Sequence, residues 1–465
     1  MSANDAREAG DAALRIAAEL GVEAPPGALR ITGEDAVLPV KYALGISGAG
    51  VFGACGLGLA QLARLRGAPA QVAHVDVTHA ALGLVSFRQI RLDGQPIGSP
   101  GDANPMVGMY RCRDGRWIAI HGGFPTLREP TLRVLGATGD TESIAAATAR
   151  RDSAELEEAL AAERMCGVVC RTADEWAATV PGAALAAEPL VSVERIAGGD
   201  PVPLPALPAG AGPMAGVRVL DFTRILAGPT CGRFLASAGA DVVVATTPRL
   251  PNMENYALET SHGKRFADVD LALPQGQALA RELADRCDVL VDSYRTGALS
   301  RHGLGPHQLA ERRNGVVYVS INCYGYGSHW TTRPGWELMG QAATGLATGH
   351  GGIDSPQPLW TYPCDYLTGY LAGLGVARAL VRRAAEGGSW HVKVSLCRTG
   401  MYTEAFGVRY DPPPAPRDLA AAYCRQTDTA RGRLRYLPVP IELPETPLSG
   451  FREAVVVPAG ERIWA

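Results

Sequence analysis

One aspartate precedes a long apolar stretch and is the residue best placed for carboxylate chemistry. Asp365 begins the run DYLTGYLAGLG, which predicts a helix over residues 365–385, and Trp360, Tyr362 and Cys364 precede it. A carboxylate in apolar surroundings can act as a nucleophile and form covalent acyl intermediates. An aspartate at the start of a helix more often caps the first turn by accepting its free N–H groups. Asp365 by itself leaves both roles open.

A second candidate site is a turn between a predicted strand and a predicted helix. The apolar run 217–222 is typical of a strand that is buried on both faces. Pro229 is tolerated at a helix start, and Gly228 lacks the Cβ that would keep a ligand away from the backbone. Free N–H groups at such a helix start favour an anion. The same pattern also fits a strand–turn–helix unit without a ligand.

From residue 216 onward, predicted strands and helices alternate. The expected strands are 217–222, 241–245, 288–291, 316–321 and 391–396, and the expected helices are 229–238, 275–286, 306–312, 336–348 and 365–385. This rhythm is typical of an α/β fold, with an open, mostly parallel sheet covered by helices on both faces.

The first 200 residues follow another pattern. Residues 106–120 alternate and turn at Asp114-Gly115, which is a hairpin signal, and charge-rich helical sequence follows at 154–165 and 173–178. This indicates a small α+β domain. Residues 197–213 contain five prolines and are expected to form a linker.

Five segments, taken in order, resemble the class III CoA-transferases of the CaiB/BaiF type. They are GVRVLDFTRILAGPTCGRFLASAGAD, SHGKRFADVDL, VDSYRTGALSRHGLG, RPGWELMGQAATG and CDYLTGYLAGLG, and the resemblance runs from residue 216 to about residue 401. The family includes carnitine and formyl-CoA transferases and α-methylacyl-CoA racemases. The resemblance implies a Rossmann-like CoA-binding domain and a small α+β domain joined by long linkers.

The resemblance also assigns a reaction. Thr368-Gly369 match the small residues that follow the nucleophilic aspartate of the transferases, which makes Asp365 the expected nucleophile. CoA would pass from an acyl-CoA donor to a carboxylic acid through an aspartyl anhydride and an aspartyl-CoA thioester. CoA and acyl-CoA are then substrates, and no covalently bound cofactor is expected.

Glu337 separates the two main chemistries of the family. Racemases resemble one another in carrying a His-Asp pair at this position, whereas transferases carry an aromatic residue followed by glutamate, as Trp336-Glu337 does here. Glu337 is therefore expected in the active site, although a surface helix carboxylate is the simpler interpretation. Two alternatives stay open, namely a racemase or isomerase with a displaced base, and a repurposed CoA-fold protein without transferase activity.

The matching motifs also supply candidates for binding CoA, which is a polyanion with an adenine ring. The candidates are Ile225, Leu226, Arg249, Lys264, Arg265, Ser293, Tyr294 and Arg301. Two segments depart from the family. VATTP (244–248) stands in place of K-V-E-x-P, and SYRTG (293–297) in place of N-F-R-P-G. Each single cation is also compatible with a solvated surface charge.

The order of the parts differs from that of the resembled family, because the small domain comes first. The chain therefore resembles a circularly permuted member. Residues 45–81 loosely repeat 364–400, with Ile46 in place of Asp365. The expected units are 1–100, which complete the large domain, the small domain 101–195, the linker 196–215, the CoA-binding domain 216–405 and an extended tail 406–465.

Composition limits the classes of partner. A net charge of −3 argues against nucleic acid, and the scattered cysteines indicate reduced thiols in a cytoplasm, with Cys166 and Cys170 on one helix face. No metal-ligand pattern is present in the sequence. Residues 42–63 lack charge but hold six glycines, which favours a buried helix over a membrane span. The resemblance implies a homodimer, because the resembled family forms dimers of interlocked chains.

Overall fold

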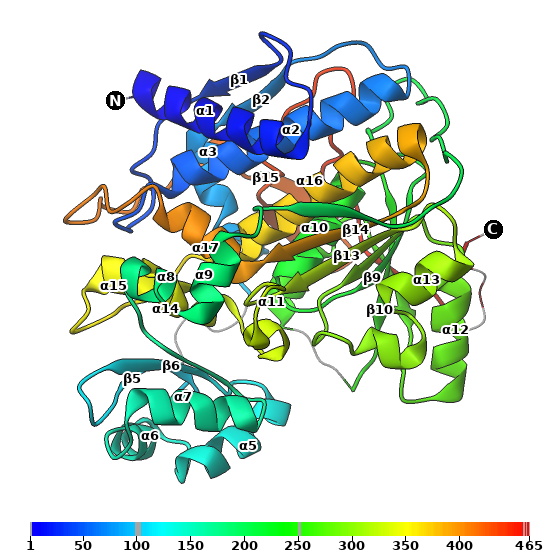
Figure 1. Cartoon of the computed structure of the whole chain (residues 1–465). Coiled ribbons are helices and arrows are strands. Elements are labelled where there is room, and N and C mark those ends of the chain that lie inside the picture. Colours follow the sequence, from blue (N-terminus) through cyan, green and yellow to red (C-terminus); the bar gives the residue numbers. More distant parts are fainter. Residues whose placement is uncertain (1, 98–103, 250–252, 459–460, 462, 465) are drawn as a thin grey trace.

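The centre of the protein is an eight-stranded sheet. The computed structural model describes residues 2–97, 104–249, 253–458, 461 and 463–464 (Figure 1). The strand order is β17 (Val455–Val456), β11 (Arg265–Asp268), β10 (Asp241–Thr246), β9 (Arg218–Phe222), β12 (Val289–Asp292), β13 (Val317–Asn322), β14 (Ser389–Ser395) and β8 (Ser192–Ala197). All neighbours are parallel except the antiparallel pair β14–β8. The predicted open, mostly parallel sheet is confirmed.

Alternating side chains of each strand enter two separate cores, because successive residues of a strand point to opposite faces. On one face Val219 and Val242 pack with α10 (Ala227–Ser237) and α16 (Pro363–Glu386). On the other face Leu220 and Val243 pack with α12 (Pro274–Ala284) and α13 (Pro306–Arg312). Both faces are therefore covered, as the apolar runs of the strands predict.

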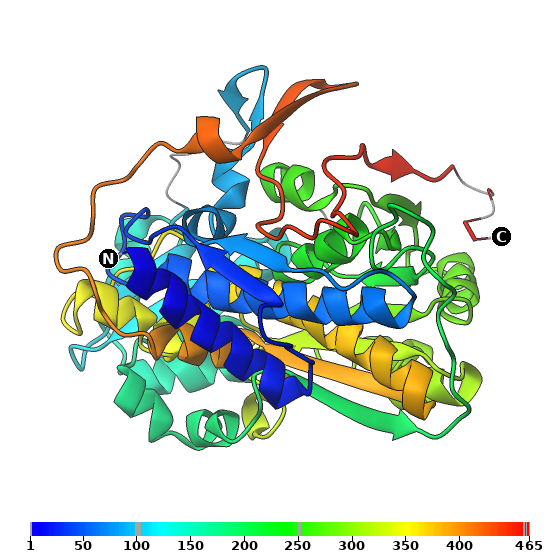
Figure 2. The same cartoon turned by 90° about the horizontal axis from the view of Figure 1, so that it is seen from above.

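The N-terminal helices form a further layer over α16. Helix α1 (Ser2–Leu20) packs on α2 (Leu44–Leu65), and α2 packs on α16 (Figure 2). Close packing depends on glycine: a Cβ on Gly58 would lie 2.6 Å from Leu374 Cδ1. Helix α2 is the one helix of the described residues that is long and apolar enough to span a membrane, and 89% of its most apolar window is buried in the fold.

A strand–helix–strand–helix unit occurs twice. In the first half it is β1 (Leu29–Thr32), α2, β2 (Ala73–Asp76) and α3 (Val77–Gly83). In the second half β13, α16, β14 and α17 (Leu396–Glu404) follow the same plan, with α14 and α15 inserted after β13. The two strands of each unit are parallel neighbours. Ile46 and Asp365 are each the third residue of their helix, as the predicted repeat requires.

The small domain lies below α14 and α15 in Figure 1. Its antiparallel sheet is β5 (Val107–Arg111), β6 (Trp117–His121) and β7 (Cys166–Val169), and its helices are α5 (Pro125–Leu135), α6 (Thr141–Thr148) and α7 (Ser153–Ala162). Cys166 begins a strand and Cys170 follows it, so the predicted shared helix face is wrong. The expected boundary between residues 100 and 101 lies outside the described residues.

Two further segments differ in detail from the expected elements. The predicted helix 336–348 is divided into α14 (Glu337–Ala343) and α15 (Leu346–Gly351), because Gly345 adopts a left-handed conformation with φ of +99°. The C-terminal tail contains β15 (Arg425–Thr429) and β16 (Gly432–Tyr436), which pair with each other. Strand β16 also pairs with β3 (Arg91–Leu92) of the first half, which in turn pairs with β4 (Gln95–Pro96). The tail therefore folds onto its own chain.

Candidate active site

Two carboxylates meet at the N-terminus of α16. Asp365 is 7% exposed and Glu337 is 6% exposed. The backbone N–H of Asp365 donates to Glu337 Oε2 at 2.6 Å, and that of Cys364 donates to Glu337 Oε1 at 3.3 Å. Gln341 Nε2 donates to the same Oε1 at 2.8 Å. Glu337 thus supplies the acceptor that the first turn of α16 needs.

This geometry decides between the two interpretations of each carboxylate. Asp365 lies inside the first turn, and Tyr362, the N-cap residue, makes no side-chain cap hydrogen bond. Among the described residues, no donor reaches the carboxylate oxygens of Asp365. Capping is therefore performed by Glu337, and the side chain of Asp365 stays available for another role. Burial of Glu337 also excludes the interpretation of this residue as a surface carboxylate.

Burial raises the pKa values of both carboxyl groups, Asp365 and Glu337. Desolvation, followed by the charge of Glu337, raises the pKa of Asp365 well above its usual value. Desolvation raises the pKa of Glu337 to about 7, against the opposing effect of its hydrogen bonds from Gln341 and the N–H groups of α16. Since each charge disfavours the other, the two carboxyl groups titrate as a pair.

The turn before α10 lies directly against the helix that carries Asp365. A Cβ on Gly369 would lie 2.4 Å from the carbonyl oxygen of Ala227, so only glycine permits this approach. Ile225 adopts φ of +72°, a left-handed conformation that is strained for a β-branched residue. The two regions that stand out in the sequence, 225–229 and 365–369, are therefore neighbours in space.

A cavity of about 490 Å³ opens at the carboxyl edge of the sheet, between the large and small domains. Its walls follow the ends of β9, β12 and β13, and the small domain contributes residues 124–127 and Cys166. Ligands of open parallel sheets bind at this edge. The predicted residues Arg249, Ser293, Tyr294 and Arg301 all line the cavity.

The cavity is strongly cationic. Five arginines line it, namely Arg224, Arg249, Arg295, Arg301 and Arg333. Arg249 pairs with Asp270 at 2.5 Å, and Arg333 pairs with Glu158 at 2.6 Å. Burial lowers the pKa of Arg224 and of Arg295, which indicates partial desolvation of both guanidinium groups. Such a lining suits a ligand with several negative charges and an apolar portion.

Two wall residues lead from the cavity to the carboxylates. Trp336 lines the cavity and immediately precedes Glu337. Cys323 also lines it, and its thiol has a raised pKa because of burial, its contact with Cys397 and the charges of Asp365 and Glu337. The buried carboxylate pair is not among the residues that line the cavity, but it lies next to the cavity wall at Trp336 and Cys323.

The other four predicted binding residues do not line this cavity. Ile225 and Leu226 are buried in the adjacent turn. Lys264 Nζ donates to Asp221 Oδ2 at 3.1 Å and to the carbonyl of Pro229 at 2.8 Å, so it joins β9 to α10. Arg265 Nε donates to Asp241 Oδ1 at 2.9 Å. The sequence HGKR does not distinguish a cation in a buried ion pair, such as Lys264, from a cation that is available to bind a ligand.

Some cavity residues gave no signal in the sequence. Phe124 and Cys166 come from the small domain, which lies before the matching motifs in the chain. Arg224 and Arg333 stand inside the motifs but were indistinguishable there from surface charges. Trp360 was expected to help enclose Asp365, but it is 66% exposed, so this expectation is wrong. Phe87 stacks on Tyr362 instead, with ring centroids 4.7 Å apart.

Metal ligands are not grouped in the part of the chain that the structure describes. Outside the gaps at residues 98–103, 250–252 and near the C-terminus, no cluster of three or more His, Cys, Asp or Glu side chains is placed to hold an ion.

The fold and the cavity are those of an α/β protein that offers a cationic ligand site at the carboxyl edge of its sheet, next to a buried carboxylate pair. The model of CoA-transferase family III matches residues 8–201 and 214–416. The chain belongs to this family.

Curated relatives are related at moderate identity. The chain is 32% identical to an acetyl-coenzyme A transferase, nodX, of Hypoxylon pulicicidum over 315 residues, which cover 63% of this chain and 53% of the relative. It is 29% identical to an acyl-CoA transferase of Gibberella moniliformis over 369 residues, which cover 71% of this chain and 65% of the relative. The match therefore spans less than two-thirds of either relative.

Solved structures include a protein, Rv3272, of Mycobacterium tuberculosis, which is 31% identical, with a TM-score of 0.40 over 42% of this chain and 58% of that one. A CaiB/BaiF family protein of Brucella suis is 24% identical, with a TM-score of 0.39 over 48% of this chain and 65% of that one.

Proposed function

We propose that this protein is a CoA-transferase that moves CoA from an acyl-CoA donor to a carboxylic acid, with Asp365 as nucleophile. The observation that carries this proposal is the buried carboxylate pair beside a cavity lined by five arginines. The names of the relatives support it, since two are called acetyl- and acyl-CoA transferases and a third, from Agrobacterium fabrum, is called succinate–glutarate CoA-transferase.

The cavity accounts for binding in this proposal. Arg249 and Arg301 bind phosphate groups of CoA, and Arg224 and Arg295 add further positive charge to the lining. Phe124 and Trp336 provide apolar surface for the uncharged part of the ligand. The small domain covers the opposite wall, so it excludes water from a thioester that would otherwise hydrolyse.

The proposed reaction conserves the thioester through exchanges at Asp365. A carboxylate oxygen of Asp365 attacks the donor carbonyl carbon, the new C–O bond forms, and the C–S bond breaks to release CoA thiolate. The thiolate attacks Cγ of Asp365, which releases the donor acid and leaves an aspartyl-CoA thioester. The acceptor carboxylate then displaces the thiolate, and the thiolate attacks the acceptor carbonyl, which restores Asp365.

Glu337 prepares the nucleophile in this scheme. Its carboxylate holds the N–H groups of Cys364 and Asp365, and so fixes the backbone from which the nucleophile projects. Its charge also raises the pKa of Asp365, and a more basic carboxylate is a better nucleophile once it has lost its proton. Glu337 is thus a positioning residue that also adjusts the reactivity of its neighbour.

Trapping distinguishes a transferase from its rivals. Acetyl-CoA is incubated with the protein, hydroxylamine is added, and the peptide that contains residue 365 is examined by mass spectrometry. We expect a hydroxamate on Asp365 in the wild type and none in Asp365→Ala, with turnover at least a thousandfold lower in the variant.

The expected control is that Asp365→Ala still folds and binds CoA, because the cap of α16 comes from Glu337. Wild-type turnover by the folded variant would end the nucleophile proposal. Deuterium exchange at the α-carbon of the acyl group, without trapping, would identify a racemase or isomerase. If neither trapping nor deuterium exchange is observed, the protein is a repurposed member of this fold without transferase activity.

A further inference from the structure

Six consecutive residues form a strap along the cavity and lead into the carboxylate pair. The strap, residues 331–336, joins the short helix η2 (His329–Thr332) to α14, and all its members line the cavity. It ends at Trp336, beside Glu337. A Cβ on Gly335 would lie 2.3 Å from Cys323 Sγ, so the strap is packed tightly on the cavity wall. The position of the strap therefore sets one wall of the cavity.

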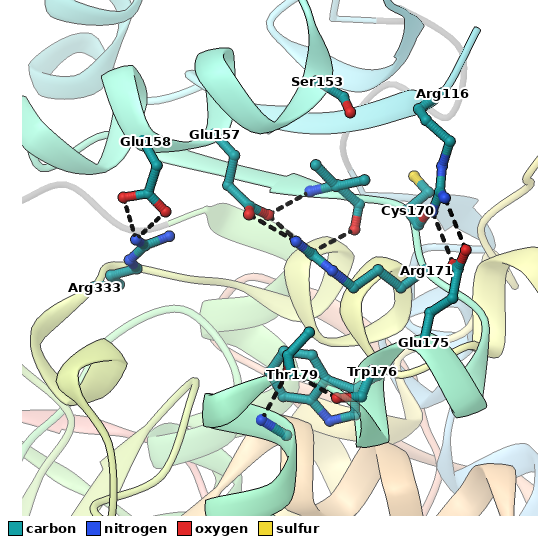
Figure 3. A network of polar contacts seen from close by, with 12 residues as sticks. Arg116, Ser153, Glu157, Glu158, Cys170, Arg171, Glu175, Trp176, Thr179 and Arg333 are labelled. Carbon is teal, nitrogen blue, oxygen red and sulfur yellow. Dashed lines mark hydrogen bonds and ion pairs between the residues drawn. The ribbon is translucent and has the colours of Figure 1, made fainter. Parts of the chain in front are cut away.

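One ion pair ties the strap to the small domain. Arg333 Nη2 donates to Glu158 Oε1 at 2.6 Å and to Glu158 Oε2 at 2.7 Å. Its guanidinium also lies over the ring of Trp330, 4.0 Å from the centroid. The Arg333 side chain is 12% exposed, whereas that of Glu158 is 65% exposed. Figure 3 shows this pair, with Glu158 projecting from α7 toward Arg333.

A second, buried pair lies beside the first. Arg171 Nη2 donates to Glu157 Oε2 at 2.7 Å, and the Arg171 N–H donates to the carbonyl of Ala342 in α14 at 3.0 Å. Arg171 lies on the same Trp330, 5.7 Å from the ring centroid. Consecutive glutamates of α7 thus bind two arginines (Figure 3). The guanidinium groups of both arginines lie over the ring of Trp330. The buried pair fixes α7 to α14, and the outer pair fixes α7 to the strap.

We infer that Glu158 and Arg333 are positioning residues for the ligand of the cavity, an inference that rests on the proposed function. Their ion pair holds the strap at the place where it forms part of the cavity wall, together with residues 124–127 of the small domain. The far end of the strap is held separately, because the ring of Trp336 packs against that of Phe124 in a tilted arrangement, with ring centroids 5.0 Å apart. Fixing a wall before the ligand arrives lowers the entropic cost of binding.

The same helix offers a matched control. Glu155 lies on α7, is exposed to a similar degree, and pairs with Arg151 at 3.0 Å within the small domain. Among the described residues, its side chain bonds to Arg151 and not to the strap. Glu155→Gln removes one charge and one exposed ion pair from α7, as Glu158→Gln does, but leaves the strap attached.

The test compares CoA binding by calorimetry, steady-state kinetics with acetyl-CoA, and amide hydrogen exchange over residues 331–336. In Glu158→Gln we expect a three- to tenfold weaker affinity for CoA, a KM raised by the same factor, and a kcat within twofold of wild type. Exchange of the strap amides rises at least threefold without ligand. Glu158→Asp keeps the charge, so we expect its CoA affinity and its exchange rate to lie between those of the wild type and of Glu158→Gln. Glu155→Gln should match the wild type in both measurements.

Each outcome decides one question. Equal CoA affinity of Glu158→Gln and wild type would overturn the positioning role and leave the proposed function intact. A wild type that does not bind CoA would overturn the proposed function, and the exchange experiment would then decide the attachment of the strap. Unchanged exchange over residues 331–336 would overturn that attachment as well. An equal loss in Glu155→Gln would assign the effect to the charge of α7.

Discussion

At the scale of single residues, the protonation state of Asp365 governs the proposed chemistry. Only an ionised Asp365 can attack a thioester, and its pKa is raised by burial and by Glu337. We therefore expect log kcat/KM to rise with pH with a slope of about one while Asp365 is protonated, at pH values above the usual range of an aspartate, and to level off once Asp365 is ionised. A pH–rate profile in buffers of constant ionic strength provides the measurement. A rate that is flat from pH 5 to 8 would contradict this prediction.

The free energy of unfolding should fall as the pH rises toward 7, whereas the rate rises. The ordinary pKa of Glu337 is 4.5 and its folded pKa is about 7. Below pH 4.5 both states are protonated; between 4.5 and 7 the unfolded chain releases a proton that the folded protein retains, so rising pH favours unfolding. The loss is on the order of 3 kcal/mol. Denaturant midpoints should therefore fall from pH 5 to 7, less steeply in Glu337→Gln.

The sequence motifs predicted site residues correctly where the topology of the sheet brings the motifs together. Asp365 and Glu337 were predicted, and the structure brings them into contact through the backbone of α16. Ser293, Tyr294 and Arg301 follow the ends of strands, where the topology places them on one edge. The burial of Lys264 could not be predicted from the sequence, because its partner Asp221 lies 43 residues earlier and each side chain by itself is typical of a solvated surface charge.

At the scale of elements, the contact between α10 and α16 joins the two candidate regions. A Cβ on Gly369 would lie 2.4 Å from the backbone oxygen of Ala227, which cannot rotate away. Gly369→Ala should therefore separate the turn from α16, cost about 1–3 kcal/mol of stability and lower kcat at least tenfold. Gly48→Ala is the control, since its nearest neighbouring atom lies at 3.5 Å. Thermal unfolding and kinetics of both variants test the prediction.

The type of each helix or strand was predicted more reliably than the breaks between helices and the pairing of distant strands. Strands 241–245 and 316–321 were expected nearly as they occur, because apolar runs between turn signals describe buried strands well. The single helix expected over 336–348 is broken at Gly345, whose left-handed backbone has no signature beyond glycine itself. The pairing of β16 with β3 joins residues more than 300 apart and depends on tertiary packing.

At the scale of the whole molecule, the homodimer implied by the family stays a prediction. The described residues that line the cavity include segments of both the large and the small domain of one chain. Sedimentation velocity at low micromolar concentration measures the assembly directly. We expect a species of twice 48.8 kDa. An active species at the mass of a single chain would contradict the dimer without affecting the proposed chemistry.

The repeated unit gives the protein an internal reference. Asp35 Oδ2 accepts the N–H of Ile46 at 3.0 Å, as Glu337 accepts that of Asp365, so both helices are capped by a carboxylate from outside. Ile46 is fully buried and cannot act as a nucleophile. The first unit therefore keeps the carboxylate cap but has no carboxylate at the position where we propose the nucleophile. A carboxylate that holds a helix end and a carboxylate proposed to react are thus found separately within a single polypeptide.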